Sequence, residues 1–309
     1  MKRCKATLAI LAILLILIST LSGCKPIVEP SEQSLSIYAS FYPIYALTSL
    51  VAKDVPNLSV QCLTEPQDGC LRDYQISDRD LYLLAYSANA VFLAGCGLES
   101  FADALIGAEN TQIAVVRLLE GLELLRSSSD IEDSHFDGAN PYLYMSIDGA
   151  IRMVENAEAG LSVLDPTYEA LYRDNADRAI ADLNALRNEL LTTASIAEGK
   201  RAAILAEPLF YVADMYKMEA ACVIERECGE SLYGSEIEDC LSALAAANIE
   251  IVLIERQAPS KLVNAIREAG FAVAQVDCMT THTEKEGVQG YFAAQRANAS
   301  AIVAALKGE

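Results

Sequence analysis

The sequence has few of the residues on which most enzyme chemistry depends. It contains 2 histidines. It has no Cys-x-x-Cys pair and no GxSxG, HExxH or P-loop sequence. A serine hydrolase, a zinc protease, a zinc ribbon and a nucleotide-binding enzyme therefore have no support. Paired carboxylates carry little information in so acidic a chain, and we expect a protein that is not an enzyme.

Basic residues are also scarce. The chain has 23 Lys and Arg against 43 Asp and Glu, which gives a formal net charge of −20. Such a surface repels nucleic acid and anionic lipid head groups, and it attracts cations only weakly and without selectivity. The hydrophobic fraction of 52% is enough for packed cores and excludes general disorder. We expect no nucleic-acid partner.

Residues 1–23 have the pattern of a secretory signal peptide. Three basic residues precede an apolar run at 8–18, which is too short to span a bilayer. The sequence Leu21-Ser22-Gly23-Cys24 resembles the bacterial lipobox, in which cleavage leaves a lipidated cysteine as the new N-terminus. We expect lipidation at Cys24, a tether at 24–34, and a protein held at the outer face of the cell membrane by its lipid alone.

The remaining cysteines leave their pairing open. Of the 9 cysteines, Cys4 leaves with the signal and Cys24 carries lipid, so an odd number remains. Short bridges are possible between Cys62 and Cys70, and among Cys222, Cys228 and Cys240. Buried free thiols are the alternative.

Short apolar runs alternate with helical patterns along most of the chain. The predicted strands are 36–40, 58–63, 90–94, 112–116, 202–206, 221–225, 250–255 and 272–276. The predicted helices are 44–53, 78–86, 98–106, 209–217, 237–246, 260–269 and 289–306. Apolar strands separated by helices predict parallel sheets that are covered on both faces.

An uninterrupted helical pattern divides two halves that begin alike. Pro166 suits a helix start, and apolar residues keep helical spacing to about Ser195, a length of roughly 40 Å. We expect an α/β fold with an N-terminal lobe at 35–164, a linking helix at 165–196 and a C-terminal lobe at 197–309. Such lobes bind ligands between the carboxyl ends of their strands.

Several segments carry a resemblance to a known family. They are Tyr38-Ala39-Ser40-Phe41-Tyr42-Pro43, Gly95-Cys96-Gly97-Leu98-Glu99, Asn140-Pro141, Asp165-Pro166 and Pro259-Ser260-Lys261-Leu262. In this order and spacing the chain resembles the zinc- and manganese-binding receptor lipoproteins of bacterial ABC importers. The resemblance implies two lobes joined by one rigid helix, a monomer, and an ABC permease and its ATPase as partners. It implies no resident cofactor, but zinc or manganese as the transported ligand.

The resemblance also implies four ligand positions in the cleft. Here they hold Arg72, Tyr142, Glu207 and Asp277. An arginine has no lone pair to give, and a tyrosine hydroxyl ionises only near a pKa of about 10. Metal binding is therefore in doubt, and Glu207 and Asp277 are the candidate metal ligands that remain.

An arginine that faces two carboxylates suggests two alternatives to a metal. Arg72 can form an internal ion pair that closes the cleft, as in a surface interaction lipoprotein without transport. Or the cleft holds a small polar organic ligand, with Arg72 on its carboxylate or phosphate and with Glu207 and Asp277 on its amine or hydroxyl.

Other side chains offer unexpected donors. Cys70 and Cys278 lie close to Arg72 and Asp277 in the sequence, so a soft metal site with Glu207 is conceivable. His282 follows Asp277 on a predicted loop and is a further candidate ligand. His135 lies in the acidic loop at 127–140, where a solvated side chain is expected.

Overall fold

The computed structural model describes residues 34–64, 74–101, 113–126, 138–224, 232 and 234–309. The predicted signal peptide and Cys24 lie outside the described residues, as do Cys70, Arg72, His135 and Cys228. In the part of the chain that the structure describes, no helix is both long and apolar enough to cross a membrane.

The first sheet lies in the N-terminal half. It contains β1 (Leu35–Ala39), β2 (Leu58–Cys62), β3 (Ala90–Leu93) and β4 (Ala114–Arg117). All pairs are parallel, in the order β2-β1-β3-β4.

The second sheet repeats this arrangement in the C-terminal half. It contains β5 (Arg201–Ile204), β6 (Glu219–Val223), β7 (Ile251–Glu255) and β8 (Val273–Val276). The order β6-β5-β7-β8 is again parallel throughout. The shared order confirms the predicted fold class of two parallel-sheet α/β lobes, and the strands begin and end within 2 residues of their predicted positions.

Most predicted helices are present. They are α2 (Tyr42–Val51), α3 (Asp78–Ser87), α7 (Leu209–Met215), α8 (Ser235–Ala246), α9 (Ser260–Glu268) and α10 (Gly287–Lys307). Only 98–101 of the helix predicted at 98–106 is described, and these residues are not helical. The sequence pattern did not predict α5 (Ile147–Leu164), an 18-residue helix that Ser146 caps by accepting a hydrogen bond from the backbone N–H of Gly149.

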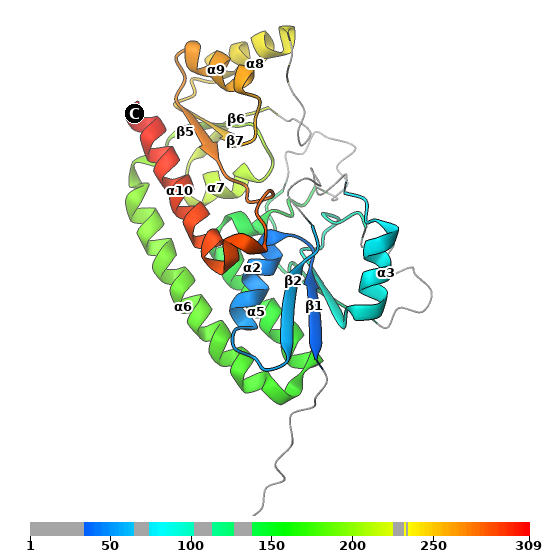
Figure 1. Cartoon of the computed structure of the whole chain (residues 1–309). Helices are drawn as coiled ribbons and strands as arrows, with labels where there is room; N and C mark the ends of the chain where they lie inside the picture. Colours follow the sequence, from blue (N-terminus) through cyan, green and yellow to red (C-terminus); the bar gives the residue numbers. More distant parts are fainter. Residues whose placement is uncertain (1–33, 65–73, 102–112, 127–137, 225–231, 233) are drawn as a thin grey trace, which may run out of the picture. The chain divides into compact units, whose positions relative to one another are not determined.

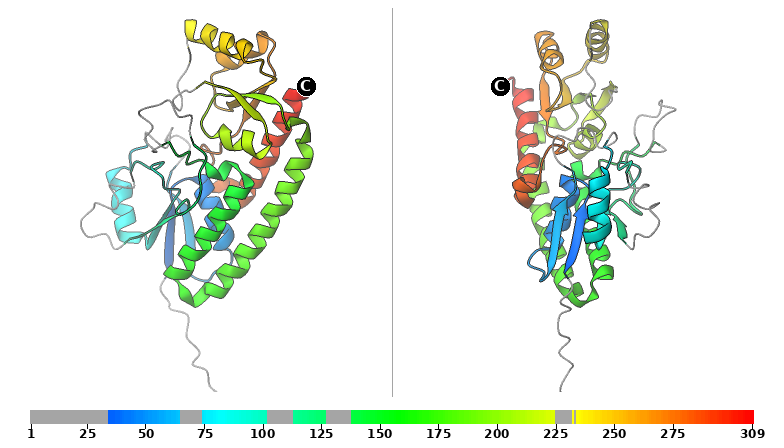
Figure 2. Two further views of the ribbon diagram at one scale, coloured as in Figure 1. Left: turned by 180° about the vertical axis from the view of Figure 1, so that it is seen from behind. Right: turned by 45° about the vertical axis from the view of Figure 1, so that its right-hand side comes forward.

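The long helix is α6 (Glu169–Thr193), with 25 residues. The short 3-10 helices Pro166–Tyr168 and Ser195–Ala197 flank it, so its regular part is shorter than the predicted 165–196. Figures 1 and 2 show α10 beside α6, and α6 also packs on α5 and α2. Asn175 on α6 donates to the carbonyl oxygens of Val51 and Lys53, at 2.9 and 2.7 Å, and so fixes the end of α2.

Alternate residues of the inner strands face different cores. Ile37, Phe92 and Leu253 enter one large core together with α2, α5, α6 and α10. Their strand neighbours Val91 and Val252 face two smaller cores, one under each sheet's other face. The helices α3 and α9 supply Leu84 and Leu262 to these smaller cores. This alternation is the period of two expected for strands buried on both faces.

Candidate functional site

The loops at the carboxyl ends of the two sheets meet through hydrogen bonds. The side-chain amide of Asn140 donates to the carbonyl oxygen of Glu207 at 2.8 Å. The hydroxyl of Tyr144, in the 3-10 helix η2 (Leu143–Met145), donates to the carbonyl oxygen of Cys278 at 3.1 Å. The chain positions around Tyr142, Glu207 and Asp277 therefore lie along one junction between the lobes.

Asp277 is the best-defined group at this junction. It follows β8, and 3% of its surface is exposed. Its Oδ2 forms an ion pair with Nη1 of Arg256 at 2.8 Å and accepts a hydrogen bond from Nε2 of His282 at 2.9 Å. Its Oδ1 accepts from the backbone N–H of Met279 at 2.8 Å. The carboxylate thus already has three partners.

Hydrogen bonds from α10 also hold the backbone of Asp277. The side chain of Asn298 accepts a hydrogen bond from the N–H of Asp277 at 2.8 Å and donates one to its carbonyl oxygen at 3.0 Å. Both residues are buried. The carboxylate therefore stands on a rigid support at the end of the sheet.

The charge state of Asp277 follows from these contacts. Burial alone raises the pKa of a carboxyl group. Here the hydrogen bonds from His282 and Met279 and the charges of His282 and Arg256 outweigh burial, so the pKa of Asp277 lies below its ordinary value. Asp277 is ionised at neutral pH.

His282 bridges Asp277 and the N-terminal half. Its ring packs on Tyr42 of α2 at a centroid distance of 4.9 Å. Nδ1 is buried and has no hydrogen-bond partner among the described residues. Nε2 contacts Asp277 and the ring face contacts Tyr42, so His282 is held from both halves.

Tyr142 and Glu207 occupy the junction but do not share the Asp277 cluster. Tyr142 is buried, and its N–H donates to Oδ1 of Asn140 at 3.0 Å. Glu207 is half-buried. Among the described residues, the side-chain partners of Asp277 do not include either one. Within the same described ranges, no three His, Cys, Asp or Glu side chains lie close enough to hold one metal ion.

Cys278 and Cys222 are both free thiols. Cys278 is buried, and burial raises the pKa of its thiol well above the ordinary value, so it stays neutral. A neutral buried thiol is a poor metal ligand. Cys222 is also a free thiol, so no bridge from Cys222 forms.

A separate loop after β3 is fixed by a buried carboxylate. Glu99 accepts from Ser40 Oγ and from the N–H groups of Ala94 and Gly95, at 2.7, 2.7 and 2.9 Å. Gly95, Cys96 and Gly97 all have positive φ, and Cys96, at +53°, is exposed. Glu99 therefore holds a tight turn at the carboxyl end of β3.

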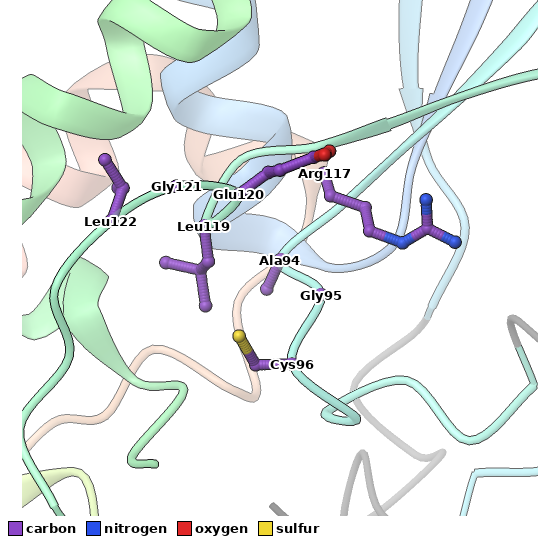
Figure 3. A pocket seen from close by; sticks show the side chains of 8 residues that line it. All are labelled: Ala94, Gly95, Cys96, Arg117, Leu119, Glu120, Gly121 and Leu122. Atoms are coloured by element: carbon purple, nitrogen blue, oxygen red, sulfur yellow. The ribbon is translucent and has the colours of Figure 1, made fainter.

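This turn borders a cavity of about 370 Å³. It is lined by residues 94–96, 117 and 119–122, at the ends of β3 and β4. Figure 3 shows the guanidinium of Arg117 directed away from Cys96. Tyr142, Glu207 and Asp277 are not among its lining residues, so this cavity differs from the predicted ligand position.

Arg256 is the residue that sequence reasoning missed. We expected the internal ion pair from Arg72, which lies outside the described residues. The register of the second sheet explains the pair, because β7 and β8 are parallel neighbours with Glu255 opposite Val276. The next residue of each strand, Arg256 and Asp277, must then lie side by side at the same edge.

The family model of zinc-uptake complex component A, periplasmic, matches residues 37–305. The zinc-binding lipoprotein AdcA of Streptococcus pneumoniae is 21% identical over 287 residues, which cover 89% of this chain and 56% of AdcA. The high-affinity zinc uptake system protein ZnuA of Bacillus subtilis is 23% identical over 257 residues, which cover 79% of this chain and 78% of ZnuA. This chain thus spans little more than half the length of AdcA.

A solved structure shares the fold. The solute-binding protein FpvC of Pseudomonas aeruginosa, in complex with Mn²⁺, superposes with a TM-score of 0.78 at 21% identity. The match covers 89% of this chain and 99% of FpvC. These findings confirm the resemblance inferred from the sequence motifs. The chain belongs to the zinc-uptake complex component A family.

Proposed function

We propose that this chain is the extracytoplasmic receptor of an ABC import system, held at the membrane by a lipid on Cys24. It captures a solute between its lobes and delivers it to a permease that an ATPase drives. The observation that carries the proposal is the meeting of the two carboxyl-end loops, where Asn140 binds Glu207 and Tyr144 binds Cys278. The family assignment and the lipobox support it.

Zinc and manganese are doubtful as its cargo. Zinc prefers imidazole and thiolate donors, usually four of them. Of the four implied positions, one holds Arg72, which has no lone pair to give to a metal ion. Another holds Tyr142, whose phenol is buried. Asp277 is already ion-paired. We expect either ion to bind no more tightly than at ordinary surface carboxylates.

The test is calorimetric titration of residues 25–309 with Zn²⁺ and Mn²⁺, with elemental analysis of the protein as isolated. Weak heats and no stoichiometric metal are expected. A one-to-one complex with a submicromolar Kd would overturn this view of the cargo. The double variant Arg72→His, Tyr142→His should gain zinc affinity, and no gain would mean that the two positions do not face one another.

A small polar organic solute is the second candidate cargo. Asp277 already binds a guanidinium, so it suits the ammonium or amidinium group of such a solute. Thermal melts in the presence of amino acids and polyamines test this candidate. A rise in Tm that disappears in Asp277→Asn is expected, and an unchanged Tm with every compound contradicts it. A surface interaction protein without transport instead predicts no permease and ATPase genes beside this one.

A further inference from the structure

We infer that Arg256 is a tethered cation that occupies Asp277 and sets how strongly a free cation must bind there. This inference deepens the proposed function, since it concerns the selectivity of the same junction. Arg256 reaches Asp277 from the neighbouring strand β7 with an N···O distance of 2.8 Å. Its guanidinium occupies the place beside the carboxylate that a bound metal ion would need.

The two partners of Asp277 differ in how easily they can leave. The side chain of His282 is 13% exposed and packs on Tyr42. The side chain of Arg256 is 55% exposed. Water can solvate the guanidinium once it swings away, whereas the displaced imidazole would stay buried without its partner. Arg256 is therefore the partner that a ligand displaces.

The backbone keeps Arg256 close to Asp277 even when the side chain moves. Its N–H donates to the carbonyl oxygen of Val276 at 2.8 Å, which continues the pairing of β7 with β8. A group attached at this distance has a high effective concentration and returns whenever the carboxylate is free. Divalent cations must overcome both this competition and the repulsion between like charges.

The remaining surroundings offer a cation site once Arg256 is removed. The Oδ2 atom of Asp277 that Arg256 contacts then keeps His282 as its remaining side-chain partner. A carboxylate oxygen suits Mn²⁺, with water completing the coordination. The junction thus contains a partial cation site that the chain's own arginine fills.

The experiment compares Arg256→Gln with wild type by calorimetric titration of Mn²⁺ and Zn²⁺ at physiological salt, which screens the acidic surface. Removing one positive charge next to a divalent ion is expected to tighten binding by about tenfold or more. The control is Arg267→Gln, in the same lobe, because Arg267 contacts Gln275 instead of Asp277. It should stay within about threefold of wild type.

Two further variants identify the arginine's charge and the carboxylate as the cause of the gain. Arg256→Lys keeps the charge and should bind as weakly as wild type. Asp277→Asn in the Arg256→Gln background should abolish the gain. Arg256→Met, which keeps the aliphatic stem, replaces Arg256→Gln if that variant does not fold.

Three outcomes would overturn the inference. They are no gain in Arg256→Gln, an equal gain in Arg267→Gln, or a gain that persists without Asp277. None of them bears on whether the chain serves an importer, which the cargo titrations and thermal melts of the wild type test separately.

Discussion

Replacing Asn140 by alanine tests whether the junction between the lobes stabilises the fold. Asn140 is fully buried. Its side chain makes two hydrogen bonds that alanine cannot make. Nδ2 donates to Glu207 O at 2.8 Å, and Oδ1 accepts from the N–H of Tyr142 at 3.0 Å. The two bonds through the Asn140 backbone, to Leu125 and from Tyr211, survive the change.

The magnitude follows from what is left unsatisfied. An orphaned N–H of the buried Tyr142 costs about 1–3 kcal/mol, and the bond lost at Glu207 costs about 1 kcal/mol more. We therefore expect the free energy of unfolding to fall by about 2–4 kcal/mol. Asn140→Asp should lose at least as much, because a carboxylate oxygen would then face the carbonyl of Glu207.

Urea unfolding followed by circular dichroism measures this loss as a lower midpoint with an unchanged slope. Asn184→Ala is the matched control. The amide of Asn184 donates only to Ile180 O, one turn away in α6, and alanine favours the helix. The control should stay within about 0.5 kcal/mol of wild type. An equally small effect of Asn140→Ala would refute the reasoning.

Three other substitutions probe separate parts of the structure by urea or thermal unfolding. Glu99→Gln should cost about 1–3 kcal/mol, because its amide N–H₂ must face a backbone N–H, whereas the exposed Glu120→Gln should change little. Gly149→Ala should cost about 1–3 kcal/mol, since its Cβ would meet the carbonyl and side chain of Leu143; a loss no larger than that of Gly199→Ala, a solvent-facing glycine with positive φ, would contradict this. The lowered pKa of Asp277 means that its stabilising effect is present above the unfolded pKa of about 3.8 and is lost as pH falls through the folded pKa. The difference in unfolding free energy between wild type and Asp277→Asn should therefore shrink as pH falls below about 4, and a difference that grows in that range would contradict the assigned charge.

The inner strands β3 and β7 were predictable from the sequence because they are buried on both faces. Val91, Phe92 and Leu253 belong to continuous apolar runs, which are typical of parallel strands covered on both faces. The helix α5 was missed for a physical reason. Gly149 and Gly160 lower its helix propensity, but they let it approach Leu143 and Val116 closely. Tertiary packing therefore fixes a helix that local preference does not favour.

The sequence did not predict the ion pair that the structure shows. The predicted arginine was Arg72, which lies outside the described residues, whereas Asp277 pairs with Arg256. Arg256 was missed because sequence motifs describe neighbours along the chain and not neighbours across a sheet. Strand order decides which residues become neighbours across a sheet, and only the pairing of β7 with β8 brings 256 and 277 together. The assignment of Arg72 to the cleft stays a prediction.

The distribution of the core limits how this junction can exchange a ligand. Phe92 of one sheet, Leu186 of α6 and Ile204 of the other sheet belong to a single buried cluster. Separating the lobes widely would expose this cluster to water at a cost of about 25 cal/mol for each Å² of apolar surface. Exchange should therefore depend on small local movements. The guanidinium of Arg256 is 55% exposed, so its departure from Asp277 is a local movement that leaves the core intact.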